Sequence, residues 1–208
     1  MSTVAKKPEG EDFPIIPAGT HHGIFIGVVD LGTQYSAYYD KESQKILLTV
    51  EIPKERIIID GKDLPRVLSR TYTNSLHEKA TLRQDLEAVR GVAFTSEDLD
   101  GFETQNILGA NCLVTVVHVE SDGKTYANIK GMAALMKGME KLVPETPTIG
   151  YDIDEDGGKI PQDLPDWIKN MIKKSKEFKK LVEPSDTDDE QSPINTDYDP
   201  NVDDGIPF

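Results

Sequence analysis

The chain has one cysteine, fewer basic than acidic residues, and no long apolar run among its 208 residues. A single cysteine, Cys112, excludes an internal disulfide and fits a reducing compartment. No stretch approaches the roughly 20 apolar residues that span a bilayer, and the polar first dozen residues lack the apolar segment of a secretory signal. The sequence therefore predicts a cytoplasmic protein, in the host cytoplasm if a phage encodes it, with no membrane partner.

Basic residues are scarce, with 23 Lys and Arg against 37 Asp and Glu and a net charge of −14. Such a balance by itself argues against nucleic acid, since Lys and Arg drive phosphate binding by releasing counterions. The acids are unevenly distributed, however, because the segment from Glu183 to Phe208 holds nine acids and no Lys or Arg. The body of the chain is only mildly acidic, and a basic groove on one face is compatible with this composition.

Patterns typical of catalysis are also missing, since no Gly-rich phosphate loop, no sequence context of a Ser or Cys nucleophile and no pair of catalytic carboxylates stands out. His21 and His22 are adjacent, and adjacent residues of a strand point to opposite faces, which does not suit a metal site. Residues 152–156 resemble the first half of a calcium loop, but Asp163 stands where a bidentate Glu belongs. We expect no enzymatic activity, no metal and no cofactor.

The β-branched residues that are present predict strands in the first third of the chain. Residues 19–31 alternate through His22, Ile24, Ile26 and Val28, and residues 44–52 and 67–73 show the same pattern, with a shorter piece at 55–59. Glycines inside the first of these strands are typical of bulges or bends. The first two strands are expected to form a hairpin.

Helical spacing then replaces alternation. Apolar residues predict a helix from Asn74 or Ser75 to Gly91 and a second one over residues 96–108. Residues 112–119 and 125–129 return to strand composition and are joined by Asp122-Gly123, a strong hairpin signal. Three strands, a helical insert and two strands match the five-stranded oligonucleotide/oligosaccharide-binding (OB) barrel. A small barrel of the SH3 type is the alternative, but it has no place for some 30 helical residues.

Composition divides the chain into five segments. We expect a flexible arm at 1–16, the all-β OB domain with its helical insert at 17–143, an acidic linker at 144–162, an amphipathic helix at 163–182 and a disordered acidic tail at 183–208. The helix could pack on its own barrel or on that of a second copy, so a homo-oligomer is possible.

An OB barrel binds single strands by stacking bases on exposed aromatics while cations follow the backbone. The candidate stacking residues are Tyr35, Tyr38, Tyr39, Tyr72 and Tyr126. The candidate phosphate contacts are Lys41, Lys45, Arg56, Arg66, Arg70, Lys124 and Lys130. Any single Tyr can instead be half-buried packing, and any single Lys a solvated side chain. The grouping of three tyrosines between the first two strands favours the binding interpretation, because OB barrels bind ligands beside that loop.

The last six residues combine two carboxylates, Asp203 and Asp204, with an apolar tip, Ile206-Pro207-Phe208. This tail resembles that of bacterial single-stranded DNA-binding proteins, whose acidic C-termini end in a similar Ile-Pro-Phe tip that recruits replication and repair proteins. Gly205 stands where that motif usually has a third Asp, which should weaken one charge contact. A solubilising disordered tail is the alternative.

A second resemblance covers about residues 17–178. It is carried by the segments 82–86 (LRQDL), 90–95 (RGVAFT), 106–109 (NILG), 123–129 (GKTYANI) and 164–168 (LPDWI). Together they resemble a family of small phage and prophage replication-region proteins often described as single-stranded DNA-binding. The resemblance implies a protein of DNA replication, recombination or repair whose partners are single-stranded DNA and, through the tail, other replication proteins. An OB-fold adaptor that docks protein without strong DNA affinity is the alternative.

Overall fold

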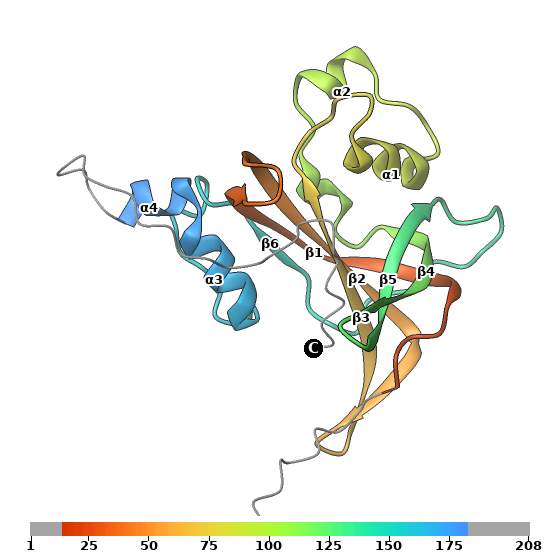
Figure 1. Ribbon diagram of the computed structural model, residues 1–208. Helices are drawn as coiled ribbons and strands as arrows, with labels where there is room; N and C mark the ends of the chain where they lie inside the picture. Colours follow the sequence, from red (N-terminus) through yellow and green to blue (C-terminus); the bar gives the residue numbers. More distant parts are fainter. Residues whose placement is uncertain (1–13, 183–208) are drawn as a thin grey trace, which may run out of the picture.

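A nearly closed antiparallel barrel of five strands dominates the structure, a computed structural model that describes residues 14–182 (Figure 1). Its strands are β1 (Gly19–Ser36), β2 (Lys41–Ile59), β3 (Lys62–Thr73), β4 (Asn111–Ser121) and β5 (Lys124–Ala133). Two short α-helices, α1 (Thr81–Arg90) and α2 (Ser96–Asp100), and a 3₁₀ turn, η1 (Thr104–Ile107), lie between β3 and β4. A sixth strand, β6 (Ile149–Tyr151), and two helices, α3 (Asp166–Lys174) and α4 (Lys176–Val182), follow the barrel.

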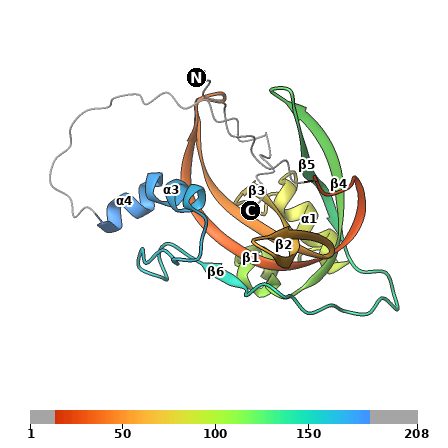
Figure 2. The same ribbon diagram turned by 90° about the horizontal axis from the view of Figure 1, so that it is seen from below.

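The strands follow the order β3-β2-β1-β4-β5. The first residues of β1 pair with β4 and the remainder pair with β2, so this one long strand bends through both halves of the barrel. Figure 2 shows the strands curving round the core, with α3 and β6 on the outer side. At the closing edge β3 approaches β5, where Arg70 Nη1 donates a hydrogen bond to the Lys130 carbonyl at 3.4 Å.

Two register shifts bend β1, one between Phe25 and Gly27 and one between Asp30 and Gly32. The glycines therefore mark bulges, as the sequence predicted. Because the first bulge adds a residue, Phe25 and Val28 both face the barrel core, and the alternation predicted through Ile24, Ile26 and Val28 does not continue across it.

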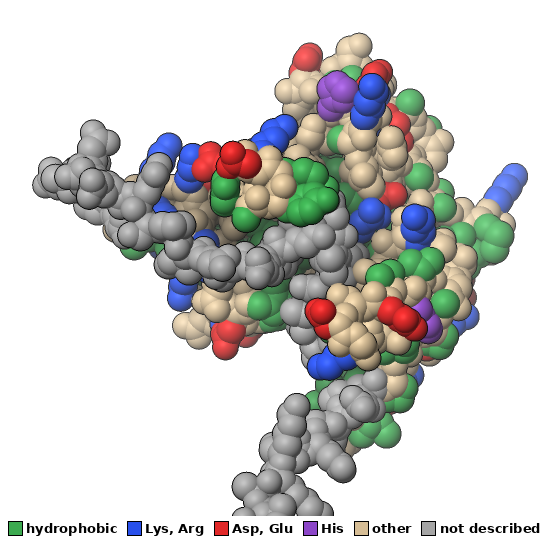
Figure 3. Space-filling view, viewed as in Figure 1, with side chains coloured by type: hydrophobic (Ala, Val, Ile, Leu, Met, Phe, Trp, Pro, Cys, Tyr) green, Lys and Arg blue, Asp and Glu red, His purple; other side chains and the backbone are tan. Residues whose placement is uncertain are grey.

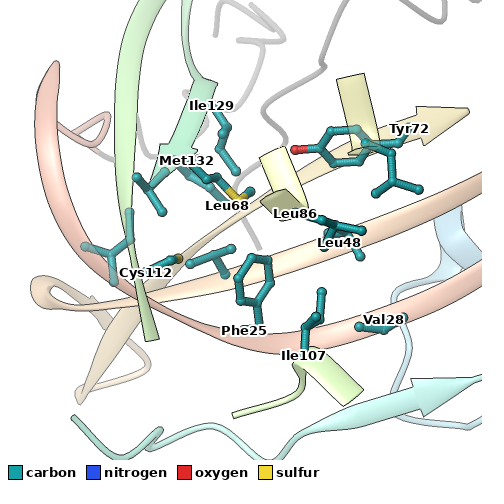
Figure 4. Packing of buried hydrophobic residues seen from close by; sticks show 14 of the residues in the cluster. Phe25, Val28, Leu48, Leu68, Tyr72, Leu86, Ile107, Cys112, Ile129 and Met132 are labelled. Carbon is teal, nitrogen blue, oxygen red and sulfur yellow. The ribbon is translucent and has the colours of Figure 1, made fainter. Parts of the chain in front are cut away.

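The sheet carries a core on each side. Inside the barrel, Phe25, Leu48, Tyr72 and Leu86 belong to the larger cluster (Figure 4). Ile46, Leu48, Val50 and Ile52 share this inner face, as their alternation predicted.

On the outer face, Val29, Leu31 and Leu47 pack against apolar residues of the later elements, namely Tyr151, Ile153, Leu164, Ile168 and Ile172. Strands that are apolar on both faces need cover on both faces, which explains this second layer. The segment expected as an acidic linker therefore contributes β6, which pairs in parallel with residues 27–29 of β1. The helical segment packs on this chain's own sheet.

Several boundaries differ from the sequence predictions. β2 is one strand of 19 residues with a register shift between Ile52 and Arg56, where two separate pieces were predicted. The helix α1 ends at Gly91 as predicted, with a left-handed φ of 71°, but it begins at Thr81 without a side-chain cap rather than at Asn74 or Ser75. The sequence predicted the end of α1 correctly because the left-handed backbone conformation that ends a helix favours glycine.

The second predicted helix begins at Ser96, where Thr95 and Asp98 form a reciprocal capping box, but it stops at Gly101. The turn at Asp122 and Gly123 has positive φ at both residues, 50° and 74°, as a type I′ hairpin requires. Within the described residues, no helix has the length and apolar content needed to cross a membrane.

The predicted helix at 163–182 is two helices with a break at Ser175, which is fully buried. The Ser175 hydroxyl donates to the Ile172 carbonyl at 2.7 Å and accepts from the Phe178 amide at 3.2 Å. It thus ends α3 and caps α4. Gly32 has a φ of 65°, and a Cβ there would lie 2.5 Å from the Ser175 Cβ, so glycine allows the strand and the helices to meet.

Candidate nucleic-acid interface

The hairpin that joins β1 to β2 carries three tyrosines in five positions. Tyr35 exposes 61%, Tyr38 76% and Tyr39 55% of its surface. Single exposed apolar residues are common on proteins, but a group of exposed aromatic rings is typical of a binding surface. The hairpin therefore offers flat π-faces to a ligand.

Short-range contacts hold these rings in place. The Tyr35 hydroxyl donates a hydrogen bond to Asp40 Oδ1 at 2.7 Å, which raises the pKa of Tyr35 above its ordinary value. The rings of Tyr38 and Tyr39 meet edge to face, with their centroids 4.7 Å apart. Asp40 adopts a positive φ of 47° in the turn, which Asp tolerates better than most residues.

The two predicted lysines of this hairpin differ in their surroundings. Lys41 is exposed at the start of β2. Lys45 is half-buried, donates to Thr73 Oγ1 at 3.1 Å, and has a lowered pKa because burial disfavours its charge. Asp40 and Glu42 lie at the same hairpin, so its charge is mixed and its tyrosines are its main feature.

Tyr72 does not join this surface. Its ring is 3% exposed inside the barrel, beside Leu48 and Leu86 in Figure 4, and its hydroxyl donates to Asp85 Oδ2 at 2.8 Å. Arg70 donates to the same oxygen at 3.1 Å. Burial raises the pKa of Asp85, although the Tyr72 hydroxyl and the Arg70 charge oppose this shift. Arg70 and Tyr72 were predicted to contact DNA. In the structure both donate hydrogen bonds to Asp85 and so connect α1 to the closing edge of the barrel.

Arg56 and Arg66 lie towards the far end of β2 and β3, away from the tyrosine hairpin. Arg56 forms salt bridges with Asp63 at 3.1 Å and Glu145 at 2.6 Å, and these carboxylates raise its pKa. Arg66 is half-buried and has a pKa lowered by burial. It lines an apolar groove of about 520 Å³ between the outer face of the sheet and the start of α3.

The remaining candidates lie on the β4–β5 hairpin. Lys124 is exposed next to its turn, and Tyr126 is half-buried opposite Val119. Lys130 is exposed at the register shift of β5, near Arg70. The structure thus gathers Tyr35, Tyr38, Tyr39, Lys41 and Lys45 on one hairpin and distributes the other candidates over three further places.

Sequence reasoning missed that α4 lies beside the tyrosine hairpin. The Glu177 carboxylate accepts two hydrogen bonds from Thr33, from its amide at 2.7 Å and from its hydroxyl at 2.6 Å. Lys176 forms a salt bridge with Glu42, and Gln34 donates to the Met171 carbonyl at 2.9 Å. These pairs are more than 130 positions apart, and no local pattern reveals such a contact.

The predicted partner-binding tip, Asp203, Asp204, Ile206, Pro207 and Phe208, lies outside the described residues, as does the rest of the tail. Within residues 14–182, no group of three or more His, Cys, Asp or Glu side chains is arranged to hold a metal ion. Comparison of the sequence with protein-family models found no match, and comparison with curated proteins found no significant similarity. The interpretation of the site therefore depends on its geometry.

Proposed function

We propose that the five-stranded barrel is an OB fold. The strand order β3-β2-β1-β4-β5, the approach of β3 to β5 and the helices between β3 and β4 all agree with that topology. The long, bulged β1 that serves both halves of the barrel agrees as well.

On this barrel, we propose single-stranded DNA binding as the function, in DNA replication or recombination of the phage type. The observation that carries the proposal is the exposure of Tyr35, Tyr38 and Tyr39 on the β1–β2 hairpin. In OB folds that loop borders the ligand, and stacking of a base on an aromatic ring contributes about 1–3 kcal/mol. The proposal includes no catalytic step and no cofactor.

Binding of the full chain to fluorescent oligo-dT and to a duplex of equal length, by anisotropy at two salt concentrations, tests this function. Stacking needs unpaired bases, so we expect tighter binding to oligo-dT, weakening as salt increases. No binding to oligo-dT at low salt, or equal binding to the duplex, contradicts the proposal.

Recruitment of replication or recombination proteins through the acidic C-terminal tip is the second part of the proposal. Its support comes from the sequence, where two carboxylates, Asp203 and Asp204, precede the apolar residues Ile206, Pro207 and Phe208. Such a segment can place Phe208 in an apolar pocket bordered by basic residues of a partner.

An OB-fold adaptor without strong DNA affinity is the second candidate. It is favoured by the salt bridges of Arg56 and Arg70, which occupy two predicted phosphate contacts, and by the apolar groove beside Arg66. Salt-independent binding of a partner protein together with no affinity for oligo-dT supports the adaptor over the DNA-binding function.

A further inference from the structure

The helices α3 and α4 are rich in lysine. From Asp166 to Val182 these helices contain six Lys and two acids, Asp166 and Glu177. Lys169 and Lys176 form salt bridges with Asp166 and Glu42. Four lysines are exposed and form no salt bridge with a carboxylate among the described residues, namely Lys173, Lys174, Lys179 and Lys180. Figure 3 shows Lys and Arg side chains on this part of the surface, at the left of the view.

These helices lie on the same side of the hairpin as Tyr35. Residues opposite each other in an antiparallel pair project to one face, as do residues two apart in a strand. Tyr35 is paired with Glu42 and follows Thr33 by two positions. Since Glu42 contacts Lys176 and Thr33 contacts Glu177, the face that carries Tyr35 is the face on which α4 packs.

The exposed side of α4 then continues this surface. At 3.6 residues per turn, Lys176, Lys179 and Lys180 share about one third of the helix circumference. Phe178 and Leu181 point the other way, towards Gly158. Lys179 and Lys180 lie about 4.5–6 Å beyond Lys176 along the axis. A strand of the roughly 4–16 nucleotides that one OB fold occupies is long enough to reach them.

We infer that a single strand leaves the tyrosine hairpin along the end of α3 and along α4, with its phosphates on Lys173 and Lys174 of α3 and on Lys179 and Lys180 of α4. This inference depends on the proposed single-stranded DNA binding and extends it beyond the barrel. It explains how a barrel with mixed charge at its aromatic hairpin, and with Arg56 and Arg70 in ion pairs, holds a polyanion. Bases stack on the hairpin, and the C-terminal helices supply the cations.

The test replaces all four lysines by Gln in the full chain, which keeps much of each side chain and removes four charges. A matched control replaces four exposed lysines elsewhere by Gln, namely Lys54, Lys62, Lys137 and Lys141, and has the same net charge. Removing one Lys–phosphate ion pair lowers the slope of log affinity against log salt by about 0.7. We expect binding to oligo-dT about tenfold or more weaker than in the control at low salt, and a slope smaller by about 1.4–2.8.

Circular dichroism and thermal unfolding of both variants check that the fold is retained. If the test and control variants bind oligo-dT with equal affinity and equal slope while the unsubstituted chain binds it, the helix path is wrong and the proposed function stands. If the unsubstituted chain itself fails to bind, both are overturned.

Discussion

Exposing an aromatic ring to water costs free energy. The β1–β2 hairpin has three tyrosines with most of their surface exposed. Tyr38 is the most exposed, and its described ring contact is with Tyr39. Replacing Tyr38 by Ala should therefore leave the thermal stability nearly unchanged. It should weaken oligo-dT binding about 5- to 150-fold, the equivalent of about 1–3 kcal/mol for one stacked base.

Fluorescence anisotropy measures this loss, and Tyr38→Phe is the matched control, since it keeps the ring and removes the hydroxyl. Retained affinity in Tyr38→Phe with loss in Tyr38→Ala supports stacking. Equal affinity of both variants and the unsubstituted chain removes Tyr38 from the site.

Asp85 should impose a pH dependence on stability. Its pKa is raised by burial in the folded state, so the folded protein binds this proton more tightly than the unfolded chain. The contribution of this group thus favours folding below its ordinary pKa and is lost as pH rises through the raised value. In urea titrations across acidic pH, the unsubstituted protein should lose stability relative to Asp85→Asn as pH rises through this window. If the free energies of unfolding of the two proteins change with pH in parallel, Asp85 does not have a raised pKa in the folded state.

At the scale of elements, the Ser175 hydroxyl forms hydrogen bonds with both α3 and α4, at the end of one helix and the start of the other. Ser175→Ala removes the cap of α4 and should lower the free energy of unfolding by about 1 kcal/mol. Hydrogen exchange locates the effect, because the Phe178 amide loses its acceptor and should exchange faster. The Asp98 amide, which Thr95 caps in α2, is the internal control. Unchanged protection of Phe178 contradicts the capping role.

Elements were predictable where the signal was local. Asp122-Gly123 fixed a hairpin and Gly91 ended a helix because left-handed backbone favours these residue types. The break at Ser175 was not predictable, because Ser175 is buried where the helices meet Gly32 of β1, far away in the sequence. The exposed tyrosines of the candidate site were found from sequence, whereas the burial of Tyr72 and the position of α4 required the fold.

For the whole molecule, charge is unevenly distributed along the chain. The acids of the last 26 residues dominate the net charge, while α3 and α4 are basic. Deleting Phe208 from the full chain should abolish retention of bacterial replication and repair proteins on the immobilised protein, because the apolar anchor is gone. Oligo-dT affinity, measured in parallel, should stay unchanged or increase slightly. Full retention of those proteins without Phe208 contradicts a recruiting role.

Photo-cross-linking shows whether a single strand stacks on the β1–β2 hairpin. An oligo-dT carrying a photoreactive thymine analogue is irradiated with the full chain, and the attached residues are mapped by mass spectrometry. We expect cross-links at Tyr35, Tyr38 or Tyr39. Cross-links confined to other residues, such as Tyr126 on the β4–β5 hairpin, or no cross-link at low salt, would contradict it.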